Sequence, residues 1–449
     1  MNKKFSVLIN NKIKKFNKTI LIESDKSISH RALLIASQCI GPSILKNILE
    51  SEDVKNTIVC LKKLGVKILK KNKTYIVYGN GLGSLQQPKK NKLYVGNSGT
   101  LARMICGLLS TNPNLKIKIF GDKSMNKRDM LRVIEPLQKI GCFFYPAGKT
   151  TLPLTIESTS MPLAQHHNEI VGSAQIKTAI LLASLNIPGI TTIEQKKISR
   201  DHTENILSIV KAGIKIKKLK KGNLVSLRGQ KNLSNFDLKI PGDLSSAAPF
   251  IALTLLTPGS KLLIKNINCN PTRLGFVNII KKMNAKVKLI NVKRINSEKT
   301  GDIVIKSSNL KSIICSSSIV PFAIDEFILC FLLAAKAKGV SIFKGLGELN
   351  KKESPRLNVI NKILNQIGIK TRLNKKIGSI KIYGNPNIDL NKFYKIETYY
   401  DHRICMAAFV MALSFGGKIK IKDCDSIATS FPKFLTTIKK IGGKYEIKK

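Results

Sequence analysis

Residues 400–413 read YDHRICMAAFVMAL, a short polar turn followed directly by a run that would be apolar on every side of a helix. A run of this kind predicts a helix buried in a protein core, because a surface helix keeps a polar face toward water. The chain repeats this pattern of a turn with Ser, Thr or Asp and then an apolar run. The other five instances begin at Ser24, Gly96, Gly172, Gly242 and Ile324.

The six helix starts are evenly spaced along the chain. The intervals between Asp25, Ser98, Ser173, Ser245, Asp325 and Asp401 are 73, 75, 72, 80 and 76 residues. A steady period indicates repeated units of one architecture, so six units account for the whole chain. Short β-like runs such as Lys116–Phe120 and Lys418–Ile421 lie between the helices. We therefore predict an α/β protein with two globular domains of three units each.

An ordinary doubly wound α/β fold is the alternative architecture. That fold commonly carries a GxGxxG turn after a strand or a Walker loop, and the sequence has neither. The length of 449 residues and the 43% hydrophobic composition are enough to bury more than one core.

The formal net charge of +50 would suit a protein that binds nucleic acid. Lysine, however, is spread over the whole chain, and there is no Trp and no alternation of aromatic and basic residues on which bases could stack. We expect no nucleic-acid partner. A basic nucleic-acid-binding protein stays open as an alternative that only the charge supports.

The sequence also bears on location and metal binding. No apolar run approaches the roughly 18 residues of a membrane span, and the N-terminal stretch MNKKFSVLIN lacks the apolar core of a secretory signal. The nine cysteines are scattered singly, without CxxC or metal-ligand spacing. We expect a cytoplasmic protein with reduced thiols, no membrane contact and no metal.

The arginines are more informative than the lysines, because only 11 of the 77 basic residues are Arg. A guanidinium binds phosphate or carboxylate with two parallel hydrogen bonds, which Lys cannot do. More than half of them lie in the segments with polar turns, namely Arg31, Arg103, Arg128, Arg200, Arg356 and Arg403. Helix N-termini attract anions as well. The pattern predicts a site for small anions.

Two carboxylates are candidates for proton transfer. Asp325 follows VPFAI and precedes FILCFLLAA after one Glu, so it lies at the mouth of a hydrophobic helix. Helix capping would explain it equally well. Glu353, in the segment NKKESPRL with Lys352 and Arg356, could be the second member of an acid/base pair.

These segments, taken in order, resemble the 5-enolpyruvylshikimate-3-phosphate synthase family. The matching motifs run from Lys26 to beyond Pro432 and read SDKSISHRA, GNSGT, GDKSMNKRDM, GSAQIKTAILLA, SRDHTENIL, PGDLSSAAPF, DEF before an apolar run, GLGELNKKESPRL, DHRICMAA and ATSFP. The resemblance implies a two-domain inside-out α/β barrel, with three βαβαββ-like repeats and buried parallel helices in each domain. It implies one domain of residues 25–242, a second of residues 1–24 plus 243–449, and an active site in the cleft between them.

The resemblance also implies the reaction. A member of this family transfers the enolpyruvyl group of phosphoenolpyruvate to the 5-hydroxyl of shikimate 3-phosphate and releases phosphate, in the pathway to chorismate and the aromatic amino acids. It needs no cofactor, and we expect a monomer whose only partners are these two substrates.

The family's site residues carry over motif by motif. Those implied for catalysis are Asp325, Glu353 and Lys26. Those implied for shikimate 3-phosphate are Lys26, Ser27, Arg31, Ser173, Ala174, Gln175, Arg200, Asp325 and Lys352. Those implied for phosphoenolpyruvate are Lys26, Gly99, Arg128, Gln175, Arg356 and Arg403.

Some positions depart from the family pattern. Thr429 stands where some relatives have a Lys on the phosphoenolpyruvate side, and Tyr400 stands where a Gly is typical before Asp401. The sister enzyme that acts on UDP-N-acetylglucosamine shares the fold and the reaction, and it is the closest alternative. It has Lys-Asn where this chain has Lys26-Ser27.

Overall fold

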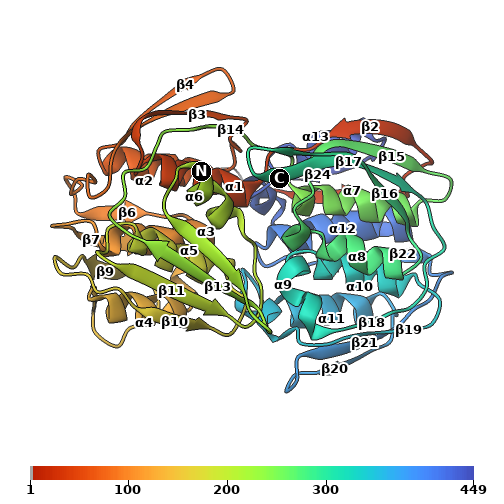
Figure 1. The fold of residues 1–449 in the computed structure, drawn as a ribbon. Coiled ribbons are helices and arrows are strands. Elements are labelled where there is room, and N and C mark those ends of the chain that lie inside the picture. The colour runs from red at the N-terminus through yellow and green to blue at the C-terminus, as the bar shows by residue number, and fades with distance from the viewer. Residues whose placement is uncertain (1–3, 449) are drawn as a thin grey trace. The chain divides into compact units, whose positions relative to one another are not determined.

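The computed structural model describes residues 4–448, which form two compact units. Unit 1 comprises residues 4–23, Gly242–Lys293 and residues 299–448. Unit 2 comprises Ser24–Pro241 together with Arg294–Glu298. In each unit, strands lie around a set of central helices (Figure 1).

Each unit contains three four-stranded sheets. In unit 2 the strand orders are β14 (Asp237–Lys239), β3 (Ile40–Lys46), β5 (Thr74–Asn80), β4 (Lys67–Lys71); β6 (Lys92–Tyr94), β7 (Lys116–Phe120), β9 (Leu154–Glu157), β8 (Phe143–Tyr145); and β10 (His166–Glu169), β11 (Ile190–Gln195), β13 (Asn223–Arg228), β12 (Ile214–Lys218). In unit 1 they are β16 (Lys286–Ile295), β17 (Glu298–Lys306), β15 (Lys261–Asn268), β2 (Asn17–Leu21); β18 (Ile314–Cys315), β19 (Val340–Phe343), β21 (Ser379–Tyr383), β20 (Thr371–Asn374); and β22 (Leu390–Ile396), β23 (Gly416–Ile421), β1 (Ser6–Ile9), β24 (Glu446–Lys448).

The six apolar runs form the central helices. They are α1 (Lys26–Ala36), α3 (Gly99–Ser110) and α5 (Ala174–Ser184) in unit 2, and α7 (Leu244–Leu256), α10 (Phe327–Ala335) and α12 (His402–Phe415) in unit 1. Every residue of α7, α10 and α12 is buried, as their composition predicts. The remaining helices are α2 (Glu52–Lys63), α4 (Leu131–Ile140), α6 (His202–Ile209), α8 (Gly275–Lys282), α9 (Val320–Ala323), α11 (Arg356–Gln366) and α13 (Phe434–Lys440).

Five of the six central helices begin at a side-chain cap. The capping residues, each accepting from a backbone N–H of the first turn, are Asp25, Ser98, Ser173, Asp243 and Asp401. The exception is α10, which has no such cap. Asp325 lies in the break between α9 and α10, so its carboxylate is not a helix cap there.

Each sheet has a parallel strand pair, and two of these pairs join distant parts of the chain. β2 leads into α1 of unit 2 but pairs with β15 of its own unit. β14 likewise leads into α7 of unit 1 but pairs with β3 of unit 2. The chain therefore changes unit between a strand and the helix that follows it, which leaves unit 1 discontinuous in sequence.

Among the described residues, no single helix has the length and apolar character to cross a bilayer. One pair of segments, Ser317–Ala323 and Phe327–Ala335, passes that test together and is bent by 115°.

Candidate active site

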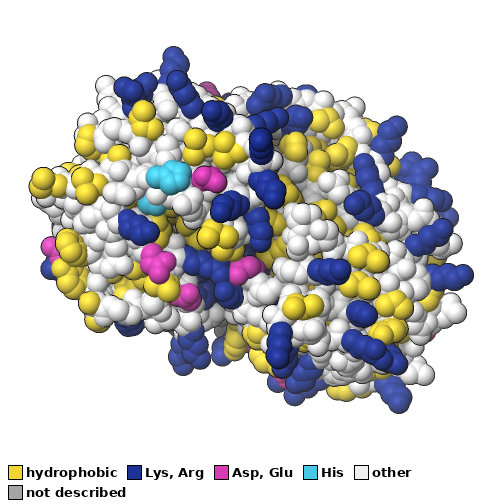
Figure 2. All heavy atoms as spheres, turned by 60° about the horizontal axis from the view of Figure 1, so that its bottom comes forward, with side chains coloured by type: hydrophobic (Ala, Val, Ile, Leu, Met, Phe, Trp, Pro, Cys, Tyr) yellow, Lys and Arg dark blue, Asp and Glu magenta, His cyan; other side chains and the backbone are white. Residues whose placement is uncertain are grey.

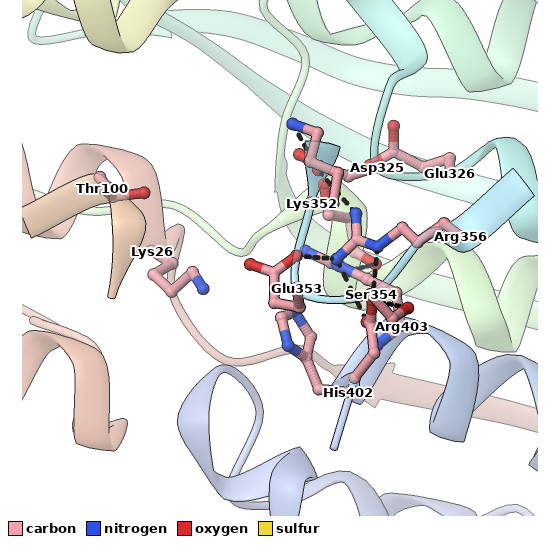
Figure 3. Close-up of polar contacts among 12 residues, drawn as sticks. Lys26, Thr100, Asp325, Glu326, Lys352, Glu353, Ser354, Arg356, His402 and Arg403 are labelled. Atoms are coloured by element: carbon pink, nitrogen blue, oxygen red, sulfur yellow. Dashed lines mark hydrogen bonds and ion pairs between the residues drawn. The ribbon is translucent and has the colours of Figure 1, made fainter. Parts of the chain in front are cut away.

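Arg356 is the centre of a charged cluster in unit 1 (Figure 3). It is the first residue of α11, and its side chain is only 1% exposed. Its Nε lies 2.8 Å from Asp401 Oδ2 and its Nη2 lies 3.2 Å from Asp401 Oδ1. Ser354 Oγ donates to the same Asp401 Oδ2 at 2.9 Å. Two-pronged pairing of this kind fixes the plane of the guanidinium.

Two further carboxylates, both partly exposed, contact the same guanidinium. Glu353 Oε2 lies 2.5 Å from Arg356 Nη2, and Asp325 Oδ1 lies 3.5 Å from Nη1. Lys352 Nζ is 3.9 Å from Asp325 Oδ1. The side chains of Asp325 and Glu353 are 19% and 18% exposed, so a small molecule can reach them.

The charges around Arg356 decide its ionisation. Burial alone would lower the pKa of the guanidinium, but the negative charges of Asp401, Glu353 and Asp325 outweigh burial and raise that pKa overall. Arg356 is therefore a permanent, immobile cation between carboxylates. Such a group suits the binding of an anion that competes with Glu353 and Asp325 for its donors.

Arg403 is a second buried arginine of unit 1, one residue into α12. Its backbone N–H donates to Asp401 Oδ1 at 2.9 Å, and its Nη1 donates to the carbonyl oxygen of Ser245 at 2.8 Å. Its Nε is buried and has no hydrogen-bond partner within residues 4–448. Thr429, on the neighbouring 3₁₀ helix, has its Oγ1 3.5 Å from His402 Nδ1.

In unit 2, the first turn of α1 carries a hydroxyl and a cation close to another arginine. Lys26 Nζ pairs with Asp53 Oδ2 at 2.9 Å, and that carboxylate is itself nearly buried. Arg200 Nη1 lies 3.5 Å from Ser27 Oγ. The structure therefore brings Ser27 and Arg200 together, although they are far apart in the sequence.

Arg31 connects three helices of unit 2. Its Nε donates to Thr203 Oγ1 at 2.8 Å, and its Nη2 donates to Thr178 Oγ1 at 3.0 Å. It also donates to two backbone oxygens, at 3.0 Å to that of Ser27 and 3.3 Å to that of Ala174. Arg31 thus fixes the starts of α1, α5 and α6 to one another.

The turn before α5 is organised by a buried carboxylate. Glu169 accepts from the backbone N–H groups of Val171, Gly172 and Ser173, at 3.2, 2.8 and 3.0 Å. Burial raises the pKa of Glu169, although these three hydrogen bonds act in the opposite direction. Ser173 in turn caps α5 by accepting from the N–H of Ile176.

Gly99, Gln175 and Arg128 lie around the start of α3. Gln175 Oε1 accepts from Arg103 Nη1 at 2.8 Å, and Arg128 Nη2 donates to Asn97 Oδ1 at 2.6 Å. A Cβ atom on Gly99 would lie 2.8 Å from Arg128 Nη1 and 2.9 Å from Arg103 Nη1. The two guanidinium groups therefore pack directly over the glycine.

The structure adds two groups to the residues expected from the sequence. Asp401 and Asp53 hold the predicted cations Arg356 and Lys26. Arg103, which is among the arginines selected in the sequence, donates to Gln175. No signal in the sequence connects Asp53 with Lys26, because that contact depends on how α1 and α2 pack.

Basic side chains are also common far from these residues. Figure 2 shows Lys and Arg spread over one face of the molecule among neutral and hydrophobic side chains, with few Asp or Glu. Many of the exposed lysines carry no acidic partner nearby, which the excess of 77 basic over 27 acidic residues makes unavoidable.

Comparison with known proteins identifies the relatives of this chain. Residues 10–438 match the family model described as EPSP synthase (3-phosphoshikimate 1-carboxyvinyltransferase). A 3-phosphoshikimate 1-carboxyvinyltransferase of Zymomonas mobilis subsp. mobilis is 36% identical over 444 residues, which is 98% of this chain and 97% of that protein. The enzyme of the same description from Petrotoga mobilis is 39% identical over 428 residues, 95% of this chain and 97% of that protein.

Solved structures give the same result. The EPSP synthase of Acinetobacter baumannii superposes with a TM-score of 0.84 at 33% identity, covering 99% of this chain and 100% of that chain. The enolpyruvyl transferase NikO of Streptomyces tendae superposes with a TM-score of 0.76 at 12% identity, covering 99% of each chain, which is a likeness of fold.

Proposed function

The chain belongs to the EPSP synthase family, and we propose that it transfers the enolpyruvyl group of phosphoenolpyruvate to the 5-hydroxyl of shikimate 3-phosphate through residues of both units. The family match confirms the predicted family, its transferase reaction in the shikimate pathway and the inside-out α/β fold. The roles of individual residues and the contribution of both units to one active site are the proposal.

The observation that supports the proposal most is the pair of partly exposed carboxylates on a buried, fixed cation in unit 1. Addition of a hydroxyl to an enol carbon needs one group to accept the hydroxyl proton and another to protonate the methylene carbon. Asp325 and Glu353 are such a pair, both reachable by solvent and both held by Arg356. We assign Asp325 to the hydroxyl and Glu353 to the methylene.

The cations of unit 1 would hold phosphoenolpyruvate. The carboxylate of phosphoenolpyruvate would accept hydrogen bonds from Arg356 and Arg403. The Nε of Arg403 is buried and has no hydrogen-bond partner among the described residues. By competing for Arg356, the substrate would displace Glu353 from the guanidinium and leave that carboxyl beside the bound phosphoenolpyruvate. Glu353 could then carry the proton that the methylene carbon needs.

Residues of unit 2 would hold the phosphates. Ser27, Arg200, Ser173 and Ala174 lie at or beside the starts of α1, α5 and α6, which Arg31 fixes together, and helix starts favour bound phosphate. We assign them to shikimate 3-phosphate, with Lys26, Arg31 and Gln175 of the same unit and with Asp325 and Lys352 of unit 1. Lys26, Gly99, Arg128 and Gln175 would meet phosphoenolpyruvate. The cationic side chains among these residues would stabilise the negative charge that develops during the reaction.

The reaction then proceeds in two balanced steps. The 5-hydroxyl oxygen bonds to C2 of phosphoenolpyruvate as Asp325 takes the hydroxyl proton, and the methylene carbon receives a proton from Glu353. The tetrahedral intermediate next loses phosphate, and a methyl proton returns to the protein as the double bond forms again. Lys26 would supply positive charge to the departing phosphate. We propose that the enzyme works in the cytoplasm as a monomer with these substrates alone.

The direct test is phosphate release from the purified protein with phosphoenolpyruvate, in the presence and absence of shikimate 3-phosphate. Release should require both substrates and should fall by about a thousandfold or more in Asp325→Ala, as expected when a general base is lost. Asp389→Ala is the matched control, because Asp389 is an exposed aspartate paired only with Lys12 in the described part of the chain. Its activity should equal that of the wild type.

Two outcomes would contradict the assignment. If the folded protein released phosphate with UDP-N-acetylglucosamine and not with shikimate 3-phosphate, the acceptor would be wrong. If neither acceptor supported release but RNA bound with an affinity that collapses on adding salt, the reaction itself would be wrong. Equal activity of Asp325→Ala and the wild type would remove Asp325 from the mechanism.

A further inference from the structure

We propose that Ser245 and Glu326 are positioning residues that tie the start of α10, next to Asp325, to the arginine Arg403. This inference rests on the proposed function, because it takes Asp325 and Arg403 as groups that meet substrate. Neither Ser245 nor Glu326 reaches the solvent that a substrate would displace, since both are buried. Their role would be to hold Asp325 and Arg403 in fixed positions relative to each other.

Ser245 makes contacts through each of its polar groups. Its backbone N–H donates to Asp243 Oδ1 at 2.8 Å, which is the cap of α7. Its carbonyl oxygen accepts from Arg403 Nη1 at 2.8 Å. Its hydroxyl donates to Glu326 Oε1 and accepts from Arg273 Nη2, the latter at 2.6 Å. One serine therefore connects α7, α10, α12 and the segment before α8.

Glu326 occupies the break between α9 and α10, directly after Asp325. Its backbone carbonyl accepts from the N–H groups of Leu329 and Cys330, so its position sets the first turn of α10. Its side chain points to Ser245, while Oε2 is buried and has no hydrogen-bond partner in the described structure. The Ser245 hydroxyl is thus the hydrogen-bonding anchor of a buried carboxylate.

This network places two carboxylates and one cation out of water. Arg273 Nη2 lies 3.0 Å from Asp243 Oδ1 and also donates to Ser245 Oγ. Asp243 therefore pairs with Arg273 directly, whereas Glu326 is connected to it through the Ser245 hydroxyl, and all four side chains are buried. Loss of one hydrogen bond in a buried polar network costs free energy because it leaves a polar group without a partner, so the complete network keeps its members in fixed positions. Asp325 is the chain neighbour of Glu326, and Arg403 is hydrogen-bonded to Ser245, so both residues adjoin this network.

The experiment compares Ser245→Ala with variants of Glu326. Ser245→Ala removes the hydroxyl and leaves the carbonyl oxygen that binds Arg403. Glu326→Ala removes the acceptor, and Glu326→Gln retains an acceptor of the same size. Thr254→Val is the matched control, because Thr254 is a buried hydroxyl residue of α7 whose hydroxyl donates to the carbonyl of Phe250, within the same helix. For each protein we would measure kcat, both KM values and amide hydrogen exchange.

We expect kcat to fall and the KM for phosphoenolpyruvate to rise by about tenfold each in Ser245→Ala and Glu326→Ala, since small displacements of reacting groups are costly. The KM for shikimate 3-phosphate should rise less than the KM for phosphoenolpyruvate, because only Asp325 and Lys352 of the residues assigned to it lie in unit 1. The double variant should be no worse than either single variant, since both break the same contact. Glu326→Gln should recover most of the activity.

Hydrogen exchange keeps the test independent of the reaction. The amides of Leu329 and Cys330, bonded to the Glu326 carbonyl, should exchange at least about tenfold faster in Ser245→Ala than in Thr254→Val. Unchanged exchange, or strictly additive losses in the double variant, would overturn the positioning role. A wild type that released no phosphate would refute the proposed function instead, while the exchange result would still decide whether Ser245 orders the start of α10.

Discussion

Asp401 accepts two hydrogen bonds from the Arg356 guanidinium, and neither side chain is more than 1% exposed. The same carboxylate accepts from the backbone N–H of Arg403 at 2.9 Å and so also begins α12. One aspartate therefore sets the position of both arginines of the cluster in unit 1. Asp401 thus acts both as the ion-pair partner of Arg356 and as the cap of α12.

Replacing Asp401 should test how much stability this contact gives. Asp401→Asn keeps the size of the side chain but sets an amide against a buried guanidinium. We expect unfolding free energy to fall by about 1–3 kcal/mol, the cost of weakening buried hydrogen bonds to a charged group, because Glu353 and Asp325 still pair with Arg356. Urea unfolding followed by circular dichroism would measure the loss. Asp389→Asn, at an exposed ion pair, is the control and should unfold with the wild type.

A methyl group on Gly99 should affect phosphoenolpyruvate more than the fold. The Cβ of Gly99→Ala would lie under 3.0 Å from the ends of Arg103 and Arg128, which are flexible and can shift. Alanine also favours a helix over glycine by up to about 1 kcal/mol. We expect an unchanged or slightly raised melting temperature and a KM for phosphoenolpyruvate raised by about tenfold or more. An unchanged KM would show that Arg128 does not bind this substrate.

The buried pair of Lys177 and Glu204 connects α5 with α6 in unit 2. Lys177 Nζ also donates to Gln195 Oε1 at 3.3 Å. Lys177→Met would leave Glu204 as a buried charge without its cation, so we expect a loss of about 3–5 kcal/mol in unfolding free energy. The double variant Lys177→Met/Glu204→Met should recover most of that loss. If the single variant were as stable as the double one, the pair would not matter to the fold.

His167 should make the protein less stable in mild acid. Burial, with smaller effects of Lys139 and His166, lowers the pKa of His167 from its ordinary 6.5 to about 4. In the unfolded chain this histidine takes a proton near pH 6.5, whereas in the folded protein it does so only near pH 4. Stability from the neutral ring is therefore complete above about pH 6.5 and is lost as the pH falls toward 4.

The variant His167→Met should show this dependence directly. Urea unfolding at pH 7 and pH 5 should reveal a smaller drop for His167→Met than for the wild type, because the variant has no proton to take up there. His166→Met changes the exposed neighbour on the same strand and should keep the wild-type drop. Identical drops in all three proteins would rule out His167 as a source of acid sensitivity.

Most of the architecture was predictable because its signals are local. The apolar runs that begin at regular intervals predicted the six buried helices, and Lys116–Phe120 was predicted as the strand it forms. The pairings β2 with β15 and β14 with β3 were not predictable from any local pattern. Each joins segments more than 190 residues apart, and such contacts depend on the packing of whole sheets.

The candidate residues show the same division. Motif resemblance selected Arg356 and Glu353, which the structure places 2.5 Å apart across three residues of sequence. It gave no role to Asp401, although that residue stood within a quoted motif, because the contact with Arg356 spans 45 residues. The roles in substrate binding remain predictions, as does the division into domains with one active site between them.

The pairing of β1 with β23 and β24 has a consequence for the order in which the nascent polypeptide can fold on the ribosome. The sheet of β22, β23, β1 and β24 places the N-terminal strand between two strands from the C-terminal part of the chain. Unit 2 has all its parts once residue 298 has emerged, whereas β1 must wait for Glu446–Lys448. At about 5–20 residues per second, translation leaves β1 without its full set of neighbours for roughly 8–30 s after unit 2 is complete. During that interval an unpaired strand is a target for chaperones and for aggregation.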